Sequence, residues 1–126
     1  MIYKVATGLD IPLVSLVSMV PQPRSEGIKV TQRSFASSGA ISNQGLYIEL
    51  EWTMLTTDEE YQTLLTAFGL LASYYAAVTV YIPTDTFVSA RYNGIAIRPE
   101  IGKDARRTNY FVRDVTILVR DLEVSV

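Results

Sequence analysis

The residues from Leu46 to Met54 alternate strictly between apolar and polar side chains. The apolar positions are Leu46, Ile48, Leu50, Trp52 and Met54, and the polar positions are Tyr47, Glu49, Glu51 and Thr53. Successive side chains of a strand point to opposite faces, so this pattern predicts a strand with one buried face and one wet face. Trp52, the only tryptophan, shares its face with aliphatic residues and is therefore predicted to lie in the core.

An amphipathic helix is predicted directly after this strand. Thr57 and Glu60 have the spacing of a capping box, and the acidic residues between them suit the positive end of the helix dipole. The apolar stripe consists of Tyr61, Leu64, Leu65 and Phe68, with Gly69 at the expected end. We assign the triplet 58–60 to capping and not to a metal site, because successive helical side chains point in different directions.

The rest of the chain is predicted to form strands and loops within a single domain, residues 1–126. Strands are expected within 1–20, 28–35, 74–82, 87–97 and 110–122, which gives the order β-β-β-α-β-β-β. The fold class is therefore mainly β with one α-helix (α+β). Flexible loops are expected near 21–27, 36–45 and 100–109. Asn93-Gly94 suits either a tight hairpin turn or a bulge.

The composition argues against most enzyme classes. The chain has no histidine and no cysteine, which removes the usual general base, the usual metal ligand and the common nucleophile pairs. Nucleotide-binding glycine motifs are also missing from the sequence. We therefore expect no catalysis, no cofactor and no metal. A hydrolase built on a carboxylate pair is the third-ranked alternative, because thirteen acidic residues offer many pairings.

The charge balance and hydropathy bear on possible partners. The formal net charge is −2, so no global positive field gathers nucleic acid. Charged residues make up 19% of the chain, below the usual quarter, which indicates that some surface is apolar and meets copies or partners. The apolar run 11–20 is too short to span a bilayer, so membrane insertion is not expected. A strand is favoured over a signal peptide for this run.

One basic patch is present, formed by Lys103, Arg106 and Arg107. Aromatic residues follow at 110 and 111, so a small nucleic-acid surface is one interpretation. The acidic residues nearby dilute the charge, and we favour a solvated hairpin tip or a salt-bridging subunit contact.

The segment 47–68, with the strand 78–83 that ends in a proline, is similar to minor tail proteins of long-tailed bacteriophages. In tube-like and distal-tail proteins of that group, a tryptophan-bearing strand leads into a short helix and then into a strand closing with proline. The resemblance covers about residues 45–83. It implies a tail-tube-like antiparallel β-sandwich or half-barrel flanked by a single helix. The chain lacks an obvious second domain and its N-terminal run has no counterpart, so tube, tube-initiator, distal-tail and adaptor roles stay open.

The resemblance also implies a location and partners. Copies would form a ring around a DNA channel, with a hexamer as one stoichiometry, stacked on other tail proteins in the virion tail after synthesis in the host cytoplasm. DNA would pass as cargo without sequence-specific binding. The candidates for subunit interfaces or the lumen are Glu49 and Glu51 on the wet strand face, Ser38 and Asn43 in the small-residue loop, and Lys103, Arg106 and Arg107 in the basic patch.

The alternative from a different class is a monomeric β-sandwich or β-barrel binding module. Eight tyrosines make a recognition surface plausible, and the candidates are Tyr74, Tyr75, Tyr81 and Tyr92. Oligomeric state separates this alternative from a ring-forming subunit.

Overall fold

The computed structural model describes residues 2–30, 33–35, 41–43, 45–55, 57–83, 88–103, 105–107 and 112–125. Eight strands form one sheet: β1 (Lys4–Thr7), β2 (Val17–Ser18), β3 (Lys29–Val30), β6 (Leu46–Leu55), β7 (Tyr75–Pro83), β8 (Ser89–Ile97), β9 (Arg106–Arg107) and β10 (Val112–Val124). A second sheet contains β4 (Arg33–Phe35) and β5 (Ile41–Asn43). The helical elements of the described residues are the 3-10 turn η1 (Leu13–Ser15) and the α-helix α1 (Asp58–Ala67).

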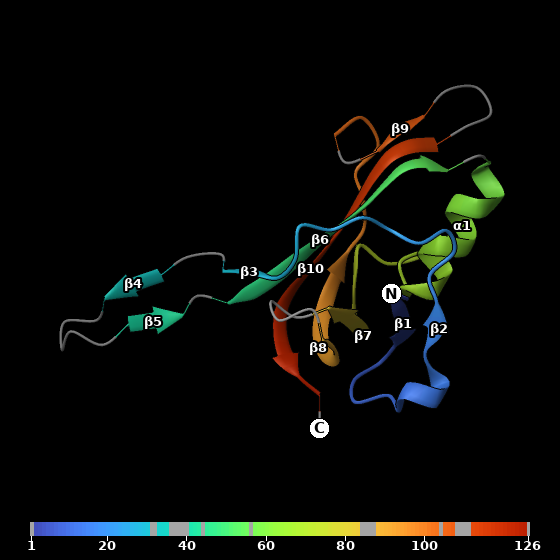
Figure 1. The fold of residues 1–126 in the computed structure, drawn as a ribbon. Helices are drawn as coiled ribbons and strands as arrows, with labels where there is room; N and C mark the ends of the chain where they lie inside the picture. Colours follow the sequence, from blue (N-terminus) through green and yellow to red (C-terminus); the bar gives the residue numbers. More distant parts are fainter. Residues whose placement is uncertain are drawn as a thin grey trace.

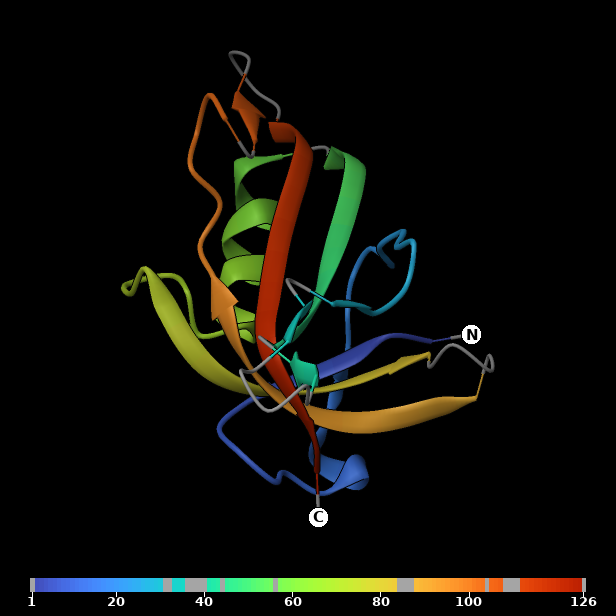
Figure 2. The same ribbon diagram turned by 90° about the vertical axis from the view of Figure 1, so that its left-hand side faces the viewer.

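The large sheet has the order β2-β1-β7-β8-β10-β6-β3, with β9 attached to β10, and all pairings between its strands are antiparallel. It curls into a half-barrel, and α1 lies against one side of it (Figures 1 and 2). The predicted class, mainly β with one helix, is confirmed. The described part of the chain has six strands before the helix and four after it, more than the predicted three on each side, because several short strands were not separable by pattern.

Strand β6 has the predicted two faces. Ile48, Leu50 and Trp52 are buried, whereas Glu49 and Glu51 between them are half-buried. The indole N–H of Trp52 donates a 2.7 Å hydrogen bond to a backbone carbonyl in the preceding loop, and its ring meets Phe68 of the helix end edge-on, with 6.2 Å between ring centroids. A buried tryptophan needs such a partner for its N–H, so the predicted core role is confirmed.

Helix α1 begins and ends where the sequence predicts. The hydroxyl of Thr57 accepts a 3.1 Å hydrogen bond from the backbone N–H of Glu60, which confirms the threonine half of the capping box. Gly69 has φ +72°, and the Leu70 N–H bonds back to the Leu65 carbonyl at 2.8 Å, which closes the last turn as in a Schellman motif. The stripe residues Leu64, Leu65 and Phe68 are buried against the sheet, so the helix covers the core.

The apolar run 11–20 differs from the expected strand. The turn η1 begins after Pro12, and pairing with β1 is limited to Val17 and Ser18. The side chain of Val14 is 93% exposed, because the turn carries it away from the sheet.

The loop 21–27 is joined to the sheet at one point. Arg24 and Glu51 exchange two backbone hydrogen bonds of 2.8 Å, which extends the edge of β6 beyond β3. The described parts of the other two predicted loops include short strands, β5 within 36–45 and β9 within 100–109. The flexibility of all three loops stays a prediction.

Asn93 and Gly94 lie within β8 and do not form a hairpin turn. The neighbouring strand β10 shifts its register between Arg120 and Glu123. A Cβ on Gly94 would lie 2.7 Å from a methyl carbon of Val119 and 3.0 Å from the Arg120 carbonyl oxygen. Of the two interpretations of this dipeptide, glycine beside a bulge is therefore right, because β10 passes too close for a side chain.

Candidate interaction surfaces

The hairpin formed by β4 and β5 is the first candidate surface. Its register pairs Arg33 with Asn43 and Phe35 with Ile41, and among the described strands these two pair only with each other. Figure 1 shows the hairpin extending away from the large sheet. A two-stranded hairpin is marginally stable alone in water, and its two open edges are templates for pairing. Asn43, a predicted interface residue, lies in β5, whereas Ser38 lies outside the described residues.

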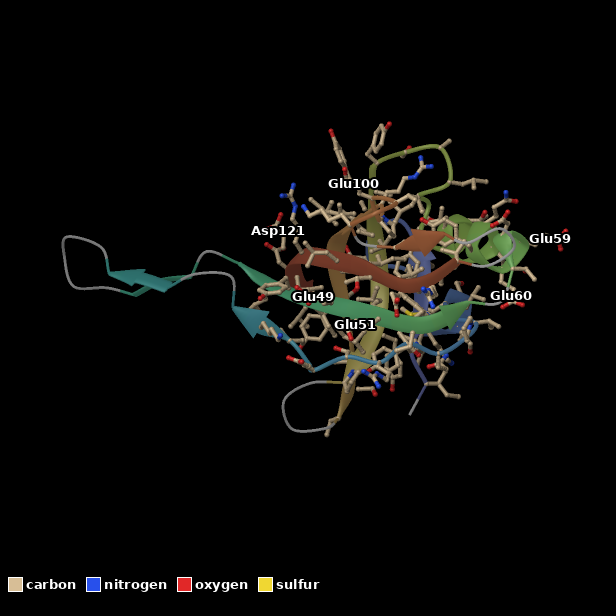
Figure 3. The ribbon with its side chains drawn as sticks, turned by 90° about the horizontal axis from the view of Figure 1, so that it is seen from above. Glu49, Glu51, Glu59, Glu60, Glu100 and Asp121 are labelled. Atoms are coloured by element: carbon tan, nitrogen blue, oxygen red, sulfur yellow. The ribbon has the colours of Figure 1, made fainter. Side chains whose placement is uncertain are left out.

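The outer face of the sheet, the side that faces away from the core, carries the two predicted acidic residues. Glu49 and Glu51 are two positions apart on β6, and their partners in β10 are Leu118 and Thr116. Figure 3 shows both glutamates on β6, with β10 between them and Glu100. The structure thus brings Glu49 and Glu51 together on one half-buried surface.

This outer face continues as an apolar strip. The register places Leu118 of β10 beside Ile97 of β8, and Ile97 beside Tyr75 of β7. Cross-strand partners share a face of the sheet. Leu118 and Ile97 are half-buried and Tyr75 is 69% exposed. The strip is more apolar than a sheet face that meets only water.

A hollow of about 650 Å³ lies at the end of this strip. We call it the tyrosine hollow, and its lining residues are Tyr61, Tyr74, Tyr75, Ile97, Arg98, Pro99, Glu100, Ile101 and Lys103. The guanidinium carbon of Arg98 lies 5.6 Å from the centre of the Tyr74 ring, and the Arg98 backbone N–H donates a 2.7 Å hydrogen bond to the Tyr74 carbonyl. The hollow therefore combines aromatic walls with a positioned cation.

Comparison of the chain with models of protein families, curated proteins and solved structures finds no match.

The four predicted tyrosines do not form one surface. Tyr74 and Tyr75 share the hollow, whereas Tyr92 of β8 lies in the hydrophobic core and is 9% exposed. Tyr81 is half-buried at a separate place on β7, opposite Lys4 of β1. Tyr61 of the apolar stripe packs against the core as predicted and also lines the hollow, because the folded chain brings it near Tyr74 and Tyr75.

The predicted basic patch is split between the hollow and a strand. Lys103 is exposed and lines the hollow, while Arg106 and Arg107 form β9 and pair with Arg113 and Val112 of β10. Arg98 completes the hollow. The sequence showed it only as a basic residue near the patch, and no motif singles it out.

The segment 14–20, together with Leu71 after α1, presents a further apolar surface. Val17 and Leu71 are 61% and 49% exposed and line a second hollow of about 710 Å³ between α1 and the strands β1 and β2. Val14 and Val20 of the same segment are also exposed. Large exposed apolar patches usually mark interaction sites.

Among the described residues, no group of three or more acidic side chains could hold a metal ion. In the same part of the chain, no helix is long and apolar enough to cross a membrane.

Proposed function

We propose that this chain is a structural subunit of the tail of a long-tailed bacteriophage, of the tube, tube-initiator, distal-tail or adaptor type. Copies join into a ring around a DNA channel, with a hexamer as one stoichiometry, and the ring stacks on other tail proteins in the virion. The observation that carries the proposal is the hairpin β4–β5, which extends from the sheet with no strand of the described chain on either edge. A neighbouring subunit would supply the missing contacts.

The exposed apolar surfaces support assembly. The strip through Leu118, Ile97 and Tyr75 leaves part of the outer sheet face uncovered, and Val14 and Val17 do the same near β1. Burial of apolar surface is the main favourable term in subunit association. A ring in which each subunit covers such surfaces of the next would remove them from water.

The charges suit a channel that lets DNA pass. The chain has a formal net charge of −2, and Glu49 and Glu51 lie together on the outer sheet face. Carboxylates repel phosphates, so a wall that carries them does not hold DNA. Glu49 and Glu51 are therefore proposed to line the lumen or a subunit contact.

The test is the solution mass of the purified chain, measured by light scattering over a concentration series and followed by negative-stain imaging. We expect rings, tubes or a defined oligomer. The decisive variant replaces residues 31–45 with a two-residue Asn-Gly turn, because β3 and β6 are already antiparallel neighbours at Val30 and Leu46 and such a turn joins antiparallel strands. This variant is expected to keep its circular dichroism spectrum and to remain monomeric.

The matched control is Ser73→Ala, a change at an exposed position between α1 and β7 that leaves the hairpin intact and lines neither hollow. It is expected to assemble like the unmodified chain. A full chain that stays monomeric at all concentrations, or a hairpin-less variant that assembles normally, would contradict the proposal.

The second candidate is a monomeric binding module, and the tyrosine hollow favours it. Tyr74 and Tyr75 are exposed there beside Arg98 and Lys103. A strictly monomeric chain that binds a ligand through these residues would replace the first proposal.

A further inference from the structure

The lining of the tyrosine hollow contains two cations and one acid. Arg98 and Lys103 lie in its wall, and within the part of the chain that the structure describes neither forms an ion pair. Glu100 is the acidic residue of the lining, and it has an interaction of its own. Two cations beside an apolar wall favour an anionic ligand with an apolar body.

Arg98 is positioned for such a ligand before binding. Its backbone N–H is bonded to the Tyr74 carbonyl, and its guanidinium group lies over the Tyr74 ring. A guanidinium group held in this way loses less freedom when it forms two parallel hydrogen bonds to a carboxylate. The arrangement therefore suits a carboxylate more than a neutral polar group.

The tyrosines supply the apolar contact. Tyr74 and Tyr75 are 77% and 69% exposed and line the same hollow. Tyrosine and arginine are the residues most often found at the energetic centre of protein interfaces. A volume of about 650 Å³ gives room for a few side chains of an extended segment.

We propose that the tyrosine hollow binds an extended acidic segment of a partner protein. A carboxylate of the segment bonds to Arg98 with Lys103 nearby, and an adjacent aromatic or aliphatic side chain packs on Tyr74 and Tyr75. Single-stranded nucleic acid fits less well, because it needs a basic track along its backbone, whereas this hollow has two cations and one acid in a chain of net charge −2.

The first experiment selects binders from a yeast-displayed library of random twelve-residue peptides with the full chain as bait. We expect the enriched peptides to carry Asp or Glu next to Phe, Tyr, Leu or Ile. One enriched peptide is then synthesised with a fluorescent label, together with a version in which lysine replaces each acidic residue. Fluorescence anisotropy is expected to show binding of the acidic peptide and none of the lysine version.

Variants locate the binding on the chain. Arg98→Gln is expected to weaken binding of the acidic peptide about tenfold, and Tyr74→Ala is expected to weaken it at least about fivefold. Effects of this size are typical of central interface residues. The matched control is Arg24→Gln, which removes an exposed arginine outside the hollow and is expected to change the affinity less than about twofold. Circular dichroism confirms that each variant is folded, since Tyr74 and Arg24 are exposed and Arg98 is half-buried.

Several results would overturn the proposal. One is a library selection that enriches no peptides, or only peptides without acidic residues. Another is an Arg24→Gln variant that binds the acidic peptide as weakly as Arg98→Gln does. Displacement of the peptide from the hollow by an oligodeoxythymidylate of equal charge at lower concentration would assign the site to nucleic acid instead. If Arg98→Gln abolishes self-association in light scattering and no peptide binds, the occupant is a second copy of the chain. Peptide binding by a chain that does not self-associate would sustain this inference and contradict the ring.

Discussion

Replacement of Gly94 by alanine tests the packing between β8 and β10. Gly94 is buried, and its φ angle is not in the left-handed region, so backbone conformation does not require glycine there. The requirement is steric. The new Cβ would lie 2.7 Å from Val119 Cγ1, 3.0 Å from the Arg120 carbonyl oxygen and 3.0 Å from Leu122 Cδ2. Ordinary carbon–carbon contacts lie at about 3.5–4.0 Å.

The magnitude follows from two opposing terms. The displacements needed to relieve these contacts in a packed core lower the free energy of unfolding by about 1–3 kcal/mol. Alanine also makes the unfolded chain less flexible than glycine does, which raises the free energy of unfolding by about 0.4–1 kcal/mol. Gly94→Ala should therefore lower the free energy of unfolding by about 1–2 kcal/mol. Val119→Ala alone removes two methyl groups from a fully buried side chain and should cost about 2–3 kcal/mol. In the double variant the Val119 methyl no longer opposes the new Cβ, so the loss should be about 1 kcal/mol smaller than the sum of the two single losses.

Urea unfolding followed by circular dichroism measures all three variants under identical conditions. The Arg120 carbonyl remains in contact in the double variant, so the rescue should be partial. A neutral or stabilising Gly94→Ala, or single effects that add to within about 0.3 kcal/mol, would refute the close approach of β10 to β8.

Three further predictions concern single contacts. Trp52→Phe removes the indole N–H that donates to a loop carbonyl and should cost about 1–3 kcal/mol in urea unfolding; an unchanged midpoint would speak against this bond. Thr79→Val removes a fully buried hydroxyl that donates to the Gly8 carbonyl at 2.8 Å, and it should lower the free energy of unfolding by a similar amount, about 1–3 kcal/mol, in the same assay. A more stable variant would contradict this hydrogen bond. The Glu26 pKa is lowered by the hydrogen bond and charge of Lys29, so in an NMR titration Lys29→Ala should move it up toward its ordinary value, and no movement would show that the pair is not formed.

The central elements of this fold could be predicted because their signals are local. The alternation around Trp52 and the Thr57 cap each involve residues close in sequence, and both were found where expected. The end of α1 at Gly69 depends on one glycine that adopts a positive φ. In these segments, backbone preference and burial favour the same structure.

The parts that could not be predicted depend on distant contacts. Val17 belongs to a strand only because β1 lies beside it, and nothing in the run 11–20 marks the two residues that pair. The alternatives for Asn93-Gly94 were settled by β10, a strand about 25 residues away. Tyr92 and Tyr74 look alike in the sequence, but Tyr92 is buried within β8, whereas Tyr74 precedes β7 and is exposed.

The same reasoning explains why the outer sheet face is the hardest part to interpret from sequence. The run 115–119 has apolar residues at four of its five positions, yet its alternate residues Thr116 and Leu118 are only half-buried in the single chain. A strand with apolar residues on both faces is typical of a sheet covered on both sides. In this chain α1 and the curled sheet cover one side, and the outer strip ends at the tyrosine hollow. The outer side of the sheet must then be covered by another molecule or stay uncovered. Apolar residues on both faces of the strand would be seen in the sequence in either case. Solution mass distinguishes them, because a covered strip requires an assembly whose population rises with concentration.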